Sequence, residues 1–149
     1  DKHIRDYADS EVVGNILFSP VIQIYNILNI TDLLDYAEEI SNESGRRIDI
    51  SFLLNNYPKC LDIRNLPQNV RDVAIQQLET WSATSKYFDA DERNKQTVLG
   101  LIKALKESYN EDSEEQMQVF KEYTLLLDSK REQSMKESIP ELWELLGWT

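Results

Sequence analysis

The sequence predicts a helix-rich α/β protein in which a small parallel βαβ sheet is followed by a helical C-terminal region. Before Pro67, two apolar extended segments flank one helical segment. After Pro67, apolar residues recur at helical spacing with few interruptions. Only 4 Gly and 4 Pro occur among the 149 residues, which favours long regular elements over a turn-rich sandwich. We expect one folding unit, with a βαβ segment at 1–66 and a helical region at 67–149 packed on it.

The first strand is expected within residues 16–26. Positions 21–25 are apolar apart from Gln23. A continuous apolar run is typical of a strand covered on both faces, as in a parallel sheet. Pro20 can begin such a strand but cannot lie inside a central one. We therefore place the strand proper at 21–25.

A helix and a second strand complete the βαβ unit. Thr31 is a suitable N-cap for the helix, and Gly45 a suitable residue to end it. Residues 48–54 contain an alternating segment that predicts the second strand. The connection makes the two strands parallel, with a right-handed crossover. A third short extended segment is expected at 61–64.

The remainder of the chain is expected to be helical. Pro67 suits the first turn of a helix, and this helix should be interrupted between 82 and 91. Later helices are expected to begin at Asp91, at a capping box formed by Ser113 and Gln116, at Asp128 and at Pro140, and Gly147 should end the last one.

Composition excludes several classes of function. The chain has 16 Lys and Arg against 27 Asp and Glu, a formal net charge of −11. Such a chain repels phosphate backbones, so we expect no nucleic-acid partner. It contains no apolar run of 18 residues, so we expect no membrane span. The N-terminus lacks the pattern of a signal peptide and an initiator Met, so we expect a cytoplasmic chain that is trimmed or belongs to a longer product.

The chain offers few residues for catalysis or metal binding. Its single Cys and single His exclude an internal disulfide, a zinc finger and an all-cysteine iron–sulfur site. His3 lies near the terminus without a second ligand, and Cys60 has no neighbouring base, so we expect both to be structural. The acidic residues at 111–115 are explained by the start of a helix. We therefore predict no catalytic residue and no metal ligand in this chain.

Gln23 and Asn26 are the most informative polar residues, because they interrupt or end an apolar strand. Ligands of parallel α/β folds bind at the carboxyl ends of strands, which makes both residues candidate ligand contacts. The alternative is that Asn26 forms the turn between strand and helix, as Asn does readily. The residues alone favour the turn.

Several short motifs resemble a known family, the radical S-adenosylmethionine (SAM) proteins with a twitch-type C-terminal region. The matching segments are Ser-Pro-Val-Ile-Gln-Ile-Tyr-Asn at 19–26, Asp-Leu-Leu-Asp at 32–35, Cys-Leu-Asp-Ile-Arg-Asn-Leu-Pro at 60–67, Leu-Asp-Ser-Lys-Arg at 127–131 and Pro-Glu-Leu at 140–142. The first three are similar to the later barrel strands of that family, and the last two to its LDxxR and PEL ending. The resemblance covers about residues 16–146.

The triple-Cys motif that defines this family is absent. The resemblance therefore implies the C-terminal part of such an enzyme, which completes the barrel and its substrate side and is not catalytic alone. It places Gln23 and Asn26 on the substrate or cofactor side. SAM and an iron–sulfur cluster are implied only for a longer intact protein, and we expect no cofactor in this chain.

The expected partner is either the missing N-terminal half-barrel or a second copy of the chain. Two or three strands leave edges with unpaired backbone groups, which recruit further strands. We expect the C-terminal helices to cover one face of the sheet but not to supply backbone pairing at its edges, so a homodimer is the simplest remedy. The alternative function, from another class, is a free-standing acidic helical module for protein interaction.

Overall fold

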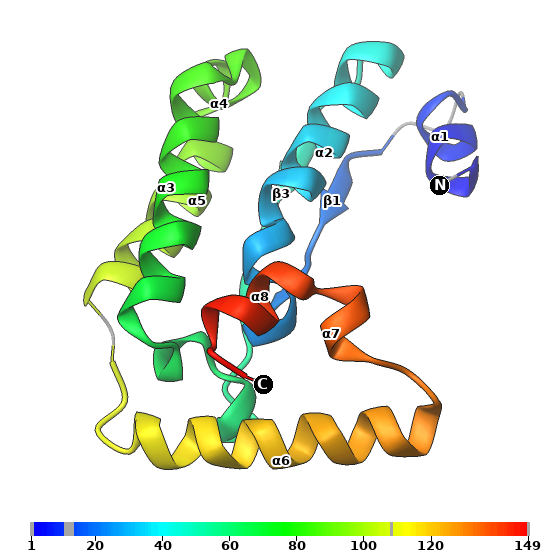
Figure 1. Cartoon of the computed structure of the whole chain (residues 1–149). Helices are drawn as coiled ribbons and strands as arrows, with labels where there is room; N and C mark the ends of the chain where they lie inside the picture. The colour runs from blue at the N-terminus through cyan, green and yellow to red at the C-terminus, as the bar shows by residue number, and fades with distance from the viewer. Residues whose placement is uncertain (1, 11–13, 108, 149) are drawn as a thin grey trace.

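The computed structural model describes residues 2–10, 14–107 and 109–148. It confirms a helix-rich α/β fold with a small parallel sheet and C-terminal helices (Figure 1). The first part contains α1 (Lys2–Ala8), β1 (Ile16–Phe18), β2 (Val21–Ile22), the 3-10 helix η1 (Ile24–Asn29), α2 (Ile30–Ser44), β3 (Ile48–Ile50) and β4 (Leu53–Leu54). The second contains the 3-10 helices η2 (Lys59–Leu61) and η3 (Ile63–Asn65), then α3 (Gln68–Thr84), α4 (Lys86–Ala90), α5 (Glu92–Glu107), α6 (Ser113–Arg131), α7 (Met135–Ser138) and α8 (Pro140–Leu145).

The strands form one parallel ribbon in two short sections. β1 pairs with β3, and β2 pairs with β4, both in parallel. Between the sections, Ser51 N donates to Phe18 O at 2.9 Å and Leu53 N donates to Pro20 O at 3.1 Å. The ladder therefore continues in one register, and α2 provides the expected crossover between the two strands.

Two predicted strand segments have another structure. The strand expected at 21–25 ends at Ile22, because the Asn26 side chain accepts from Gln23 N at 2.9 Å and donates to Val21 O at 2.8 Å. These bonds turn the chain into η1. The segment 61–64 is not extended either: it belongs to η2 and η3, where Asp62 accepts from Arg64 N at 2.9 Å. In both places an Asn or Asp side chain hydrogen-bonds nearby backbone groups, and this local bonding takes the place of pairing with a neighbouring strand.

The helix starts differ from the expected caps by one or two residues. α2 begins at Ile30 with Asn29 at its N-cap, so Thr31 lies inside the helix. The N-cap of α6 is Asp112, whose carboxylate accepts from the Gln116 side chain, and Ser113 is buried. Gly45 ends α2 as expected, at φ +67, in the left-handed region that glycine favours.

The C-terminal helices follow the prediction in part. The expected break at 82–91 contains α4. Asp128 lies inside α6, yet its carboxylate accepts from Met135 N at 2.8 Å and so binds the first residue of the short helix α7. α8 begins at Pro140 as expected, and Gly147 follows its last turn at φ +66.

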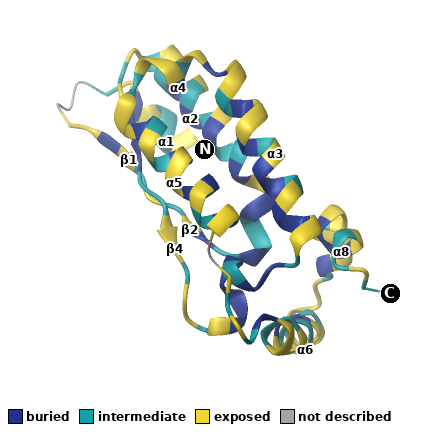
Figure 2. Ribbon diagram, turned by 90° about the vertical axis from the view of Figure 1, so that its left-hand side faces the viewer, coloured by how far each residue is buried: buried dark blue, intermediate teal, exposed yellow. Residues whose placement is uncertain are grey.

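One hydrophobic core contains residues from both sides of Pro67. It includes the fully buried side chains of Ile22, Leu34, Ile48, Leu78, Leu105 and Phe120. Figure 2 shows buried residues alternating with exposed ones along α3 and α5, as expected for helices with one face on the core. Within the described residues, no helix has the length and apolar character needed to cross a membrane.

Helix side chains hydrogen-bond the outer edge of β3. Asn94 of α5 accepts from Ile50 N at 2.8 Å and donates to Ile48 O at 2.8 Å. The Tyr87 hydroxyl accepts from Ile48 N at 3.2 Å and donates to Ile48 O, and Thr97 donates to Ile50 O at 3.2 Å. These helices offer no backbone pairing in the described residues, but their side chains bond the outward backbone groups of β3 where a further strand would otherwise lie.

The opposite edge of the ribbon, at β1, is exposed. In a parallel ladder alternate residues bond to the partner strand, and Phe18 O bonds to Ser51 N. Leu17 N–H and C=O consequently point away from β3, and among the described residues they have no recorded hydrogen bond. The Leu17 side chain is 54% exposed and that of Val21 48%. We call this edge, from Leu17 to Val21, the open edge.

Candidate functional site

Three amide side chains meet at the carboxyl end of the ribbon. Gln23 follows β2, Asn55 follows β4, and Asn26 lies in the first turn of η1. Asn55 Nδ2 donates to Gln23 Oε1 at 3.3 Å, and Asn55 N donates to Ile22 O at 2.9 Å. All three residues are half-buried. The structure thus brings both sequence-predicted residues together and adds Asn55.

The hydrogen bonds of Asn26 give it a structural role that requires no ligand. Its carbonyl oxygen and its amide nitrogen each bond to backbone, at Gln23 N and Val21 O, as expected for a turn residue. The side-chain oxygen of Gln23 accepts from Asn55 Nδ2, whereas its side-chain nitrogen makes no hydrogen bond within the described residues. A contact of Gln23 or Asn26 with substrate or cofactor stays a prediction.

Asn55 is a residue that the sequence analysis missed. It directly follows the second predicted strand, as Gln23 directly follows β2 in the neighbouring strand. The carboxyl ends of parallel strands lie at the same edge of a sheet, so the position of Asn55 directly after a predicted strand could have placed it beside Gln23. Amides donate and accept hydrogen bonds but do not titrate. Gln23, Asn26 and Asn55, which we call the strand-end cluster, are therefore suited to binding and orienting a polar group, not to transferring a proton.

A groove of about 330 Å³ lies between α6, the start of α3 and the C-terminal residues. Its volume is at the lower end of the range for small-molecule sites. It is lined by Asn65, Pro67, Tyr109, Ser113, Glu114, Met117, Gln118, Lys121, Leu146 and Trp148. Three distant segments supply these residues, so no local pattern in the sequence could predict the groove.

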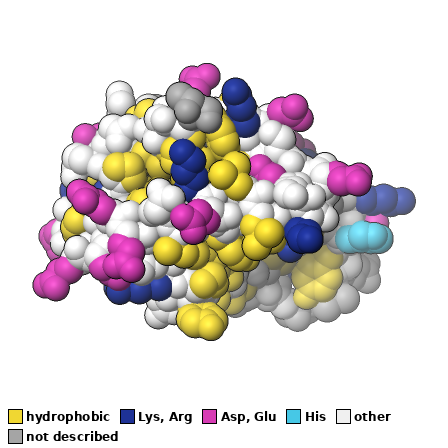
Figure 3. All heavy atoms as spheres, turned by 60° about the horizontal axis from the view of Figure 1, so that its bottom comes forward, with side chains coloured by type: hydrophobic (Ala, Val, Ile, Leu, Met, Phe, Trp, Pro, Cys, Tyr) yellow, Lys and Arg dark blue, Asp and Glu magenta, His cyan; other side chains and the backbone are white. Residues whose placement is uncertain are grey.

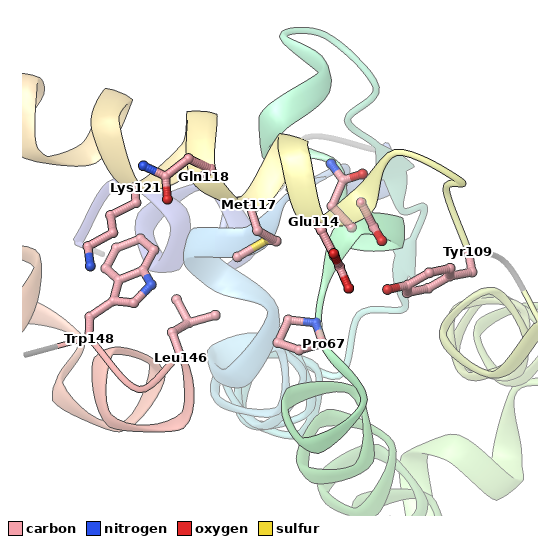
Figure 4. Close-up of a pocket in the computed structure, with 10 residues that line it drawn as sticks. Pro67, Tyr109, Glu114, Met117, Gln118, Lys121, Leu146 and Trp148 are labelled. Carbon is pink, nitrogen blue, oxygen red and sulfur yellow. The ribbon is translucent and has the colours of Figure 1, made fainter.

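Opposite charges mark the two ends of the groove (Figure 4). Lys121 lies at one end beside Trp148, with its Nζ 5.7 Å from the indole centroid. Glu114 lies nearer the Tyr109 end, and Met117, Leu146 and Pro67 lie between them. Seven residues along α6 separate Lys121 from Glu114, a rise of about 10 Å between their backbone positions. The groove therefore suits an elongated ligand with an apolar middle and a charge of opposite sign at each end.

Buried contacts hold the walls of the groove. Asn65 is 1% exposed, donates to Lys59 O at 2.6 Å and accepts from Asn110 Nδ2 at 2.7 Å. The Trp148 ring packs on Phe120 and edge-on against Trp143, with centroid distances of 5.4 and 5.3 Å. These contacts fix one polar and one aromatic wall before any ligand arrives.

Cys60 and His3 lie apart from these features. Cys60 is a free, buried thiol, and burial raises its pKa, which keeps the sulfur protonated and unreactive. His3 is exposed on α1. Across the described ranges, no group of three or more His, Cys, Asp or Glu residues is arranged to hold a metal ion.

The residues of the LDxxR and PEL motifs organise the end of the chain. Asp128 binds the start of α7, Pro140 occupies the first turn of α8, and Leu142 is fully buried. Arg131 lines a cavity of about 200 Å³ that also contains Tyr25, whose hydroxyl lies 2.7 Å from Thr124 Oγ1. Burial raises the pKa of Tyr25, so it remains a neutral phenol. Most of the motif is thus explained by packing and capping.

Comparisons of the chain with family models, with curated proteins and with solved structures found no match.

Proposed function

We propose that this chain acts as the C-terminal portion of a radical-SAM-like enzyme. In this proposal it completes a parallel barrel, contributes to the substrate side and is not catalytic alone. The triple-Cys motif, the iron–sulfur cluster and SAM belong to an N-terminal half-barrel that is its partner. One Cys cannot provide the thiolates that such a cluster needs. Its lone thiol is in keeping with a cytoplasmic protein.

The observation that carries this proposal is the difference between the two edges of the ribbon. Parallel sheets occur almost always with several strands and with both faces covered. Here one edge is bonded by Asn94, Tyr87 and Thr97, whereas the open edge presents Leu17 and Val21 to solvent. A further strand can therefore join only at β1 in this section of the ribbon. An N-terminal half-barrel would provide that strand.

The strand-end cluster gives the second support. Barrel enzymes bind their ligands at the carboxyl ends of the strands, and Gln23, Asn26 and Asn55 follow the ends of β2 and β4. We assign Gln23 and Asn26 to the substrate or cofactor side. Gln23 is the direct contact in this assignment, because both polar atoms of Asn26 already bond to backbone.

The test begins with the coding DNA upstream of the codon for Asp1. An in-frame CxxxCxxC segment supports the proposal, and a stop codon followed by a start site contradicts it. The upstream segment is then co-expressed with this chain as a separate polypeptide. We expect the two to co-purify, and Leu17→Pro to abolish co-purification by removing the N–H at the open edge. Leu17→Thr, which keeps that N–H, is the matched control.

The open edge also explains the other expected partner, a second copy of the chain. Without the N-terminal half, two copies can pair through β1, and two-fold symmetry then makes the two strands antiparallel. Sedimentation velocity of the isolated chain tests this: we expect Leu17→Pro to lower the dimer fraction that depends on this edge.

One observation favours the alternative function, a free-standing acidic helical module for protein interaction. Val119, Leu125 and Leu126 on α6 are 42–57% exposed, although this helix belongs to the folded core through Phe120. A start site directly upstream of Asp1, together with unchanged binding of partners by Leu17→Pro, would support this module over the half-barrel.

A further inference from the structure

The outer face of α6 carries exposed apolar residues between two charged ends. α6 turns Phe120 and Thr124 toward the core and leaves Val119 42% and Leu126 57% exposed. Figure 3 turns this side of the molecule forward and shows hydrophobic side chains across its middle, with acidic ones toward the left, where α6 begins. The face is independent of the strand-end cluster and of the open edge.

Four residues of this face lie in one stripe along the helix. Val119 and Leu126 are seven residues apart, which is close to two helical turns. Glu115 lies four residues before Val119, and Lys130 lies four residues after Leu126. We call these four residues the α6 stripe. Its order along the helix is acid, apolar, apolar, base.

The α6 stripe is complementary to itself in the antiparallel direction. Reversed, the order becomes base, apolar, apolar, acid, so each group meets its complement in a second, antiparallel copy. A parallel arrangement would instead place Glu115 beside Glu115 and Lys130 beside Lys130. A two-fold axis requires this kind of self-complementary surface.

We propose that two copies of this chain associate through antiparallel α6 helices. Val119 packs against the partner's Leu126, and Glu115 forms an ion pair with the partner's Lys130, twice per dimer by symmetry. The axis passes between Glu122 and Tyr123, so Tyr123 faces the partner's Glu122. Gln118 Nε2 donates to Glu122 Oε1 at 2.9 Å and holds this carboxylate along its own helix, beside the stripe.

The dimer is expected to be weak. One pair of helices covers less surface than the roughly 800 Å² per partner of a standard stable interface. The net charge of −11 on each copy also opposes association, although at physiological salt this repulsion is screened beyond about 8 Å. We therefore expect dissociation in the micromolar range or above, in moderate salt.

Sedimentation velocity over a roughly 100-fold range of concentration, from about 5 to about 500 μM, brackets such an affinity and tests the proposal with the whole chain. Leu126→Glu should raise Kd by about tenfold or more, because each dimer loses two buried Leu side chains and gains two charges. Leu125→Glu is the matched control: it has the same chemistry, but lies about 100° around the helix from Leu126 and outside the stripe. Equal effects of the two substitutions would overturn the proposal.

Charge reversal separates the ion pairs from the effect of net charge. Glu115→Lys and Lys130→Glu should each raise Kd by about three- to tenfold, since each turns two attractive contacts into repulsive ones. If net charge alone mattered, Glu115→Lys would strengthen association. The double variant should restore the wild-type Kd. A chain that is monomeric at every concentration, or a Glu115→Lys variant that dimerises more tightly, would refute the dimer.

The α6 dimer and the open edge are distinguished by Leu17→Pro. This substitution lies outside the stripe and should leave the α6-dependent dimerisation unchanged. If Leu17→Pro abolishes dimerisation and Leu126→Glu does not, association uses the open edge and this inference is wrong. Circular dichroism of each variant confirms that the exposed substitutions leave the helices folded.

Discussion

Replacing Asn94 by Leu is the most direct test of how the ribbon is stabilised. Asn94 is 2% exposed, and its side chain bonds to both Ile50 N and Ile48 O at 2.8 Å. Leu has nearly the same size but provides no hydrogen bond. Ile48 O keeps the Tyr87 hydroxyl as a partner, whereas Ile50 N loses the acceptor that Asn94 provides. The substitution therefore leaves a buried N–H unsatisfied at the edge of β3.

The expected loss of stability follows from these two bonds. A buried donor without a partner costs about 1–3 kcal/mol, and the second bond contributes about 0.5–1.5 kcal/mol. We expect the free energy of unfolding to fall by about 2–4 kcal/mol. At this chain length, about 2–4 °C of Tm corresponds to each kcal/mol, so Tm should fall by roughly 4–16 °C.

Thermal unfolding followed by circular dichroism measures this effect, and hydrogen exchange at Ile50 locates it. The Ile50 amide should exchange faster in Asn94→Leu, while Gln96→Leu, at an exposed position on the same helix, serves as a control with little change. Asn94→Asp offers an independent check. Its carboxylate faces the Ile48 carbonyl, so the variant should regain stability at low pH, where the protonated carboxyl can donate. An unchanged Tm and a protected Ile50 amide in Asn94→Leu would refute the reasoning.

The remaining stability predictions concern the buried side chains of Trp143 and Arg71 and the half-buried Tyr87. Trp143→Ala should lower the unfolding free energy by about 3–5 kcal/mol. Trp143→Phe should cost much less, because the buried indole N–H of Trp143 has no hydrogen-bond partner among the described residues, and thermal unfolding distinguishes the two variants. Arg71→Met should cost about 1.5–3 kcal/mol in urea unfolding, because the buried guanidinium donates to Leu105 O near the end of α5. Burial raises the pKa of Tyr87, so the unfolded chain releases this proton at lower pH than the folded one. Wild-type stability should consequently fall as pH rises past about 10, and urea titrations should show a smaller fall in Tyr87→Phe.

The fold class was predictable because its evidence is periodic. The helical spacing after Pro67 predicts α3, α5, α6 and α8, and the two apolar segments separated by an amphipathic helix predict the parallel crossover. The errors have a common cause at 23–26 and 61–64. There, Asn26 and Asp62 bond to nearby backbone and convert apolar segments into 3-10 turns. Whether such a segment forms a strand or a 3-10 turn depends on one polar side chain, and the pattern of apolar residues does not reveal this choice.

The candidate site was predictable only where it follows from strand order. Gln23 and Asn26 were found because they end an apolar run, and Asn55 was within reach of the same argument. The groove was not, because Pro67, Tyr109 and Trp148 come together only through the packing of α6 against the C-terminal residues. The bonding of the β3 edge by Asn94 was equally hidden, since this residue lies on a helix 44 positions after Ile50.

The order of the strands along the chain and the hydrogen bonding of the two edges both favour a further strand at the open edge. β1 is the first strand among the described residues, and consecutive strands of parallel sheets tend to be neighbours. A strand that precedes β1 in a longer chain would therefore join beside Leu17, while Asn94 and Tyr87 occupy the other edge. Hydrogen exchange can measure this asymmetry. In the isolated chain the Leu17 amide should exchange fast and the Ile50 amide slowly. On addition of the N-terminal half-barrel only Leu17 should become protected, and a Leu17 amide that stays fast in the assembled enzyme would contradict pairing at the open edge.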